Sequence, residues 1–149
     1  MLRPGLLAAF AAGVTACVGG QLSTRMTDTS PVAAPDVLTC AREQLKAEGF
    51  SQSSYDAERL RVSGRKFDEE QRRPDTQFRR MVDRIAIEVG PASDGALTSI
   101  TVDAMTFAEL TTQRGPTEVQ EKTSSTARDA AQTILQKCSQ PVDSASVPG

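Results

Sequence analysis

Apolar residues recur with two different periods along the chain, and the change of period divides it into elements. Val37, Cys40, Ala41 and Leu45 are spaced as on one face of a helix. We expect this helix to be capped by Asp36 and to end at Gly49, with Phe50 folding back onto it. A second helix is predicted after Pro116, ending before Pro141, and its apolar face consists of Val119, Ala127, Ala130, Ala131, Ile134, Leu135 and Cys138.

Between the two helices the apolar period is two, which is typical of strands that bury one face. Asp94-Gly95 predicts a hairpin between the second and third strands. After Ala104 the apolar positions shift to Met105 and Phe107, which indicates a bulge or the end of the strand. The three alternating sets are Leu60, Val62 and Gly64; Met81, Ile85, Ile87 and Val89; and Ile100, Val102 and Ala104.

These elements predict an α+β domain over residues 36–139, in the order helix, three antiparallel strands, helix (α-β-β-β-α). A three-stranded sheet has one apolar face to cover, so we expect both helices on one sheet face. In element order the chain resembles small envelope lipoprotein domains such as the helix-grip modules of the outer-membrane assembly machine. That resemblance implies a fold and says nothing about individual residues.

The N-terminus is typical of an export signal. Arg3 is followed by a nine-residue apolar run, residues 6–14, and by the small residues Thr15 and Ala16. A nine-residue helix rises about 14 Å, against about 30 Å for the hydrocarbon core of a bilayer. The run is therefore too short to be a stable membrane span.

The motif Val14-Thr15-Ala16-Cys17 resembles the bacterial lipobox. The resemblance covers about the first 20 residues and implies lipoprotein processing: cleavage after residue 16, diacylglycerol on the Cys17 thiol and acylation of the new amino terminus. Val18 is not the aspartate that retains enterobacterial lipoproteins in the inner membrane, which favours the outer membrane, facing the periplasm. The alternative is an ordinary secretory signal cut at the same bond, with Cys17 incidental.

Segments of Gly, Ser, Thr, Pro and Ala flank the predicted domain. We expect residues 17–35 to be the lipidated cysteine and a flexible tether, and residues 140–149 to be a disordered tail. Two cysteines, Cys40 and Cys138, remain after Cys17. Both lie on the predicted apolar faces of their helices, so we expect a structural disulfide in an oxidising compartment. Free buried thiols and a redox pair are the alternatives.

The composition argues against several kinds of chemistry. The chain contains no histidine, so imidazole bases and His-ligated metals are excluded. The acidic segment Asp68-Glu69-Glu70 with Asp75 lacks EF-hand spacing and contains arginines, which favours a solvated loop over a calcium site. No glycine-rich phosphate loop or activated serine is visible. We expect no catalytic residue, no metal and no cofactor.

Charge is distributed unevenly. Residues 58–84 contain nine basic and six acidic residues. Removal of residues 1–16 takes away only Arg3, so the net charge of the mature chain falls from −2 to −3, which argues against nucleic-acid binding. Alternation with Leu60 and Val62 places arginines on the open sheet face, and the candidates for contact with an anionic partner are Arg59, Arg61, Arg65 and Arg79.

We therefore expect a lipid-anchored envelope protein that acts as a structural or protein-interaction component without catalysis. The first alternative is a binding module for an anionic envelope polymer or ligand that uses the arginine-rich face. The bland interpretation of that face is that its charges keep an exposed sheet soluble. The second alternative is an enzyme that lacks histidine, which requires a pocket with perturbed carboxylates.

Overall fold

A computed structural model describes residues 22–141. The signal sequence, the lipobox with Cys17 and residues 142–149 lie outside these described residues. The elements, in chain order, are β1 (Ser23–Ser30), α1 (Ala34–Ala47), β2 (Ser51–Asp56), β3 (Arg61–Asp68), β4 (Phe78–Pro91), β5 (Thr98–Thr112), β6 (Gly115–Glu121) and α2 (Ser125–Ser139).

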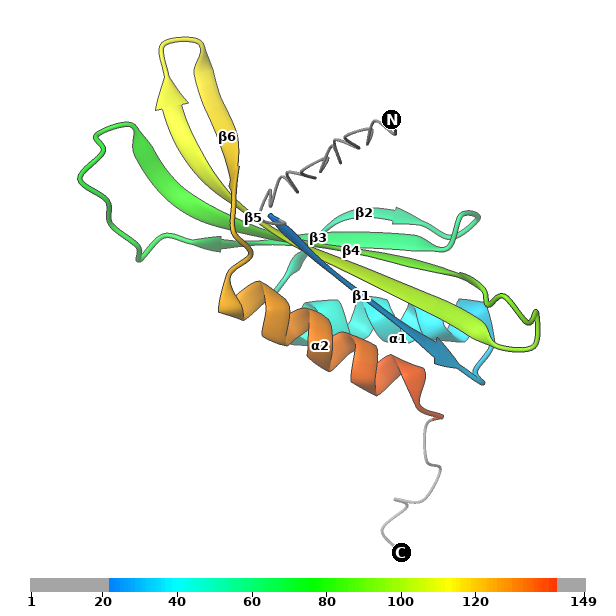
Figure 1. Cartoon of the computed structure of the whole chain (residues 1–149). Coiled ribbons are helices and arrows are strands. Elements are labelled where there is room, and N and C mark those ends of the chain that lie inside the picture. The colour runs from blue at the N-terminus through cyan, green and yellow to red at the C-terminus, as the bar shows by residue number, and fades with distance from the viewer. Residues whose placement is uncertain (1–21, 142–149) are drawn as a thin grey trace, which may run out of the picture.

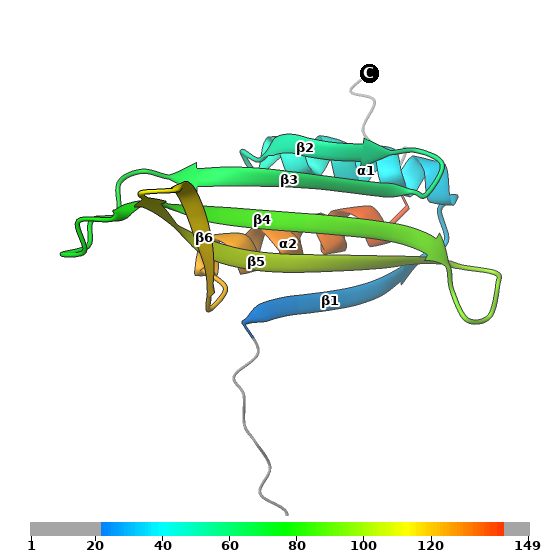
Figure 2. The same cartoon turned by 90° about the horizontal axis from the view of Figure 1, so that it is seen from above.

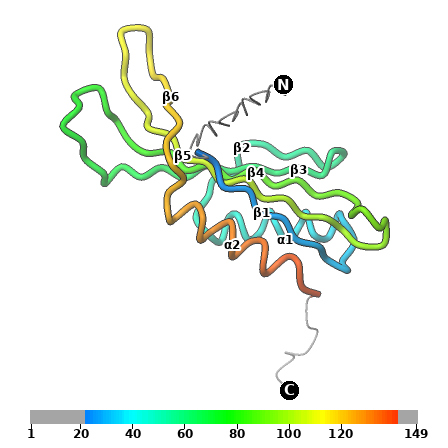
Figure 3. The backbone as a smooth tube through the Cα atoms, viewed as in Figure 1, coloured from blue at the N-terminus to red at the C-terminus, as the bar shows by residue number. Residues whose placement is uncertain are grey.

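The strands form one antiparallel sheet of six strands in the order β1-β5-β4-β3-β2, with β6 also paired to β5. Strands β1 and β6 share the same side of β5: β1 pairs with residues 98–105 and β6 with residues 106–112. Both helices lie on one face of the sheet (Figures 1 and 2). We call the other face the open face. The β5–β6 hairpin and the segment between β3 and β4 extend past the start of α2 (Figure 3).

This architecture corrects the predicted three-stranded α-β-β-β-α fold, which is wrong in strand number and order. The three predicted alternating patterns fall in β3, β4 and β5, except for Leu60, which lies in the turn before β3, and three further strands surround them. Strand β1 occupies residues expected to be tether, and β6 occupies the expected start of the second helix, with Val119 on a strand and half exposed. Strands β1, β2 and β6 lie at sheet edges and carry mostly polar residues, so no apolar alternation marks them.

Two local expectations also change. Helix α1 begins at Ala34 with Ala33 as its N-cap, so Asp36 lies in the first turn and makes no capping hydrogen bond. The expected break after Ala104 is absent from β5, which continues to Thr112, and the register shift in its pairing with β4 lies further on, between Phe78 and Arg80 of β4. Gly49 does end the helix, with a φ of +82°, and the Phe50 N–H bonds to the Leu45 carbonyl.

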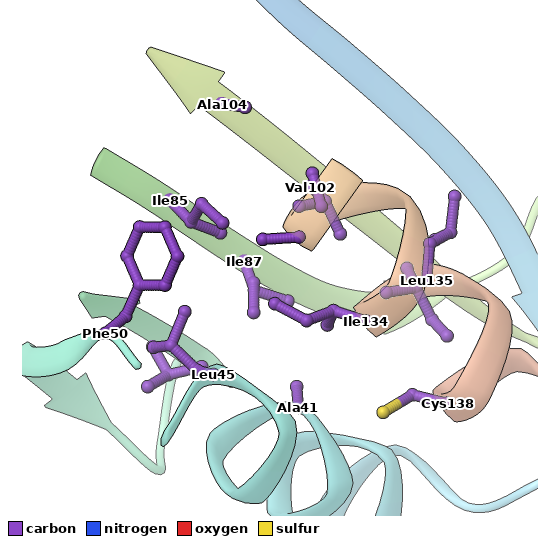
Figure 4. Packing of buried hydrophobic residues seen from close by; sticks show 14 of the residues in the cluster. Ala41, Leu45, Phe50, Ile85, Ile87, Val102, Ala104, Ile134, Leu135 and Cys138 are labelled. Carbon is purple, nitrogen blue, oxygen red and sulfur yellow. The ribbon is translucent and has the colours of Figure 1, made fainter. Parts of the chain in front are cut away.

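The core lies between the helices and the inner face of the sheet. Ala41 and Leu45 from α1 and Ile134 and Leu135 from α2 pack against Ile85, Ile87, Val102 and Ala104 of β4 and β5 (Figure 4). The sulfurs of Cys40 on α1 and Cys138 on α2 lie at bonding distance, 2.05 Å, with Cα atoms 5.8 Å apart. The predicted cysteine pair is therefore compatible with a disulfide that joins the helices side by side.

Candidate functional site

The open face carries a network of ion pairs in place of free arginines. Asp103 pairs with Arg25 at 2.7 Å, and Glu109 pairs with both Arg79 and Arg80 at 3.0 and 3.1 Å. Arg25 and Arg80 lie directly across from their acidic partners on the neighbouring strand, and Arg79 lies at the register shift of β4. Cross-strand residues on one face of a sheet lie close together, which allows these pairs to form. Side chains on this face are therefore held in place before any partner arrives.

The four arginines singled out from the sequence do not form one free surface. Arg59 lies in the turn over residues 57–60, 3.8 Å from Asp56. Arg61 pairs with Glu88 at 2.9 Å, and Arg79 pairs with Glu109. Among the described residues, Arg65 alone of the four forms no ion pair, and it is exposed on β3.

A small apolar cluster lies at the centre of the open face. Val82 is fully buried there, between its register neighbours Phe67 on β3 and Phe107 on β5. The Arg80 guanidinium lies 3.7 Å from the centre of the Phe67 ring, and the Arg84 guanidinium lies 4.7 Å from that of Phe107. This stacking orients the two arginines. Met105 and Phe107 lie on the open face, which explains why the apolar positions shift there after Ala104.

One ion pair links two segments at the end of the sheet where α2 begins. Arg73, in the segment between β3 and β4, bonds both carboxylate oxygens of Glu121 on β6 at 2.5 and 2.6 Å. The hydrogen bonds from Arg73 hold the pKa of Glu121 below its usual value, and the same bonds raise the pKa of Arg73. This pair braces the segment between β3 and β4 against the β5–β6 hairpin.

A cavity of about 390 Å³ lies where α2 begins, and we call it the Asp83 cavity. Its floor is Asp83 of β4, which is only 6% exposed. Asp83 is not among the residues predicted from the sequence, and the signal for it is a charge at an inward position of the apolar set in β4. The lining residues are Lys66, Phe67, Asp68, Glu69, Glu70, Gln71, Met81, Asp83, Thr106, Ser124, Ser125 and Thr126.

Asp83 organises the start of α2 through two hydroxyls. Thr106 and Ser124 each donate a hydrogen bond to Asp83 Oδ1, at 2.5 and 2.8 Å. Ser124 Oγ in turn accepts from the Ala127 N–H, and Thr106 Oγ1 accepts from the Ser124 N–H. The carboxylate thereby fixes the N-cap of α2 to β4 and β5.

The acidic segment Asp68-Glu69-Glu70, for which a solvated loop was predicted in preference to a calcium site, turns the chain after β3. Asp68 accepts the backbone N–H groups of Glu70 and Gln71, and Glu69 pairs with Arg80 at 3.0 Å. Within residues 22–141, no three cysteine or acidic side chains are grouped so that they could hold a metal ion.

The chain enters the domain at a defined point on the sheet edge. Ser23 pairs with Met105, halfway along β5, and Thr123 Oγ1 donates to the Leu22 carbonyl at 3.0 Å. Five residues, 18–22, separate Cys17 from β1. The expected tether is thus shortened by the whole of β1.

No family model matches the chain, and no curated protein matches it. No helix of the described residues is long and apolar enough to cross a membrane.

Proposed function

We propose that this chain is a lipid-anchored protein of the bacterial envelope that binds another envelope protein through its open sheet face and has no catalytic role. The observation that supports the proposal is the preordered network of arginines, acids and aromatic rings on that face. The lipobox at Cys17 supplies the anchor in this proposal.

The short link to the anchor restricts how the domain sits. From Cys17 to Ser23 the chain takes six Cα–Cα steps, which reach about 20 Å when fully extended. The β1 edge of the sheet is therefore held close to the bilayer surface. In this arrangement the sheet stands on that edge, and its open face remains accessible from the side.

The chemistry of the open face suits a protein partner. Arg, Phe and Met are enriched at protein interfaces, and Arg65, Phe67, Met105 and Phe107 lie on this face. Because the guanidinium groups are already stacked and paired, little side-chain entropy is lost on binding. Positive and negative groups alternate, so a partner with complementary charges is selected over one with a uniform charge.

A second candidate is recognition of an anionic envelope polymer. Within residues 22–141 Arg65 forms no ion pair, which favours this candidate, whereas the acid partners of Arg61 and Arg79 count against it. The two candidates differ in salt dependence, because binding to a polyanion weakens steeply as ionic strength rises.

Site-specific photo-crosslinking in intact cells tests the proposal. A photoreactive residue at Ala86 or Thr101 on the open face should yield one adduct of defined mass, and one at the exposed Gln132 of α2 should not. Replacing Arg65 and Phe67 by alanine should abolish the adduct. Equal labelling from Gln132, or an adduct indifferent to the double replacement, would contradict the proposal.

A further inference from the structure

The Asp83 cavity contains a buried carboxylate with no cation beside it. Asp83 forms no ion pair within residues 22–141, although burial of an unpaired charge is costly. Its cross-strand partner is Lys66, but the Lys66 ammonium turns away and donates to the Glu48 carbonyl at the end of α1, at 3.1 Å. The cation that would compensate Asp83 is therefore not supplied by its nearest basic neighbour.

The second oxygen of Asp83 faces the cavity. Both hydroxyl bonds go to Oδ1, and Oδ2 accepts none from the described residues. Asp83 Oδ2 is not one of the fully enclosed side-chain oxygens that lack a hydrogen bond among the described residues, so it retains some access to solvent. Asp83 Oδ2 is thus both unbonded and open to the cavity volume.

The rest of the lining selects for a cation. Three further acidic residues, Asp68, Glu69 and Glu70, line the cavity, against the single basic residue Lys66. Glu69 is already paired with Arg80 and Asp68 already accepts two backbone N–H groups, so Glu70 and Asp83 are the carboxylates left for a cation. Hydroxyls of Ser125 and Thr126 at the mouth supply further hydrogen-bond acceptors. A metal ion is disfavoured, because these acids are not grouped as a ligand set.

We propose that the Asp83 cavity binds a primary ammonium group, which donates one N–H to Asp83 Oδ2 and the others to the hydroxyls and acids at the mouth. An ammonium group has three donors and no acceptor, which matches a lining rich in acceptors. A trimethylammonium group has no N–H donor and cannot make these bonds.

The position of the cavity points to a source of such a group, and this step rests on the proposed lipid anchor. Thr123, which bonds to Leu22 where the chain enters the sheet, directly precedes Ser124 of the cavity. Strands β1 and β3 are three strand spacings apart, about 14 Å, so the cavity meets the bilayer only when the domain tilts from its edge-on placement. A link of about 20 Å from Cys17 to Ser23 is long enough to allow that tilt. An ethanolamine headgroup at the bilayer surface and a free amine in solution share the required chemistry.

Hydrogen exchange of the full lipidated protein in vesicles tests the site. Amides in the first turn of α2 should exchange at least threefold more slowly when phosphatidylethanolamine is added to phosphatidylcholine vesicles, or when free ethanolamine is added. Free choline should have no effect. Protection by the lipid alone, by the free amine alone or by both supports an ammonium site and identifies its source.

Variants separate binding from folding. Asp83→Asn should abolish the protection, and Ser125→Phe should do the same by filling the mouth while leaving the buried hydrogen bonds intact. Gln132→Phe, on the exposed side of α2, is the matched control and should keep it. Equal exchange with ethanolamine and choline in the wild type overturns the proposal, whereas an unlipidated Cys17 in the mass spectrum refutes the anchor and not the site.

Discussion

Replacing both Cys40 and Cys138 by alanine should remove a large part of the folding stability. The two residues are 98 positions apart, so the bond closes a loop of nearly the whole domain. The chain-entropy relation gives about 4.7 kcal/mol for a loop of about 100 residues at 25 °C. Since a domain of this size is stable by about 5–15 kcal/mol, we expect a third or more of the free energy of unfolding to be lost.

Urea unfolding followed by circular dichroism measures this loss. With a slope of about 2 kcal/mol per molar urea, the midpoint should fall by about 2 M. Reduced wild type should unfold at the same urea concentration as the double variant. Ser139→Ala, next to Cys138 and with only an exposed hydroxyl bond to lose, should leave the midpoint unchanged.

A loss below about 1 kcal/mol, or a midpoint unaffected by reductant, would refute this reasoning. In either case the two helices would be held by packing alone. The expected dependence on an oxidising compartment would then also fail.

Three further outcomes follow from particular contacts. Gly64→Ala should destabilise the domain by about 1–3 kcal/mol, because the new Cβ would lie 2.8 Å from Leu45 Cδ2 and 3.1 Å from Phe50 Cβ. Gly90→Ala, where a new Cβ meets nothing within 4 Å, is the control in the same urea assay. Arg73→Gln should lower stability at pH 6, and this cost should shrink as the pH falls below 4.5, because the lowered pKa of Glu121 gives stability that is present above the unfolded carboxyl value of 4.5 and is lost as the pH falls through the folded value. A difference between wild type and variant that is constant with pH contradicts this. Ser124→Ala should cost about 1 kcal/mol through loss of the N-cap and its bond to Asp83, whereas Ser125→Ala should cost less, as thermal unfolding would reveal.

The sequence pattern predicted those elements that bury one side. Strands β3, β4 and β5 alternate clearly because their inner positions, such as Val62, Ile85 and Val102, pack under the helices. Strands β1, β2 and β6 lie at sheet edges, where polar residues on both sides erase the alternation. Strand β1 pairs with β5, which lies about 70 residues further along the chain, and no local pattern records that contact. Strands β2 and β6 form hairpins with β3 and β5, but their polar composition hides them.

The candidate sites were predicted less well, for a similar reason. Composition located the arginines, but the partners of Arg61 and Arg79, which are Glu88 and Glu109, come from other strands and required the register. Asp83 was overlooked because a single inward charge looks like an interruption of an apolar pattern. Its significance depends on Thr106 and Ser124, which the fold brings to it from 23 and 41 residues away.

Mass analysis of the mature protein isolated from its native membrane tests the central claim most directly. The account predicts an N-terminal peptide that begins at Cys17 and carries diacylglycerol on the thiol and a fatty acyl chain on the amine. A peptide that begins at another residue, or that begins at Cys17 without fatty acid, would contradict the membrane anchor and the edge-on placement built on it.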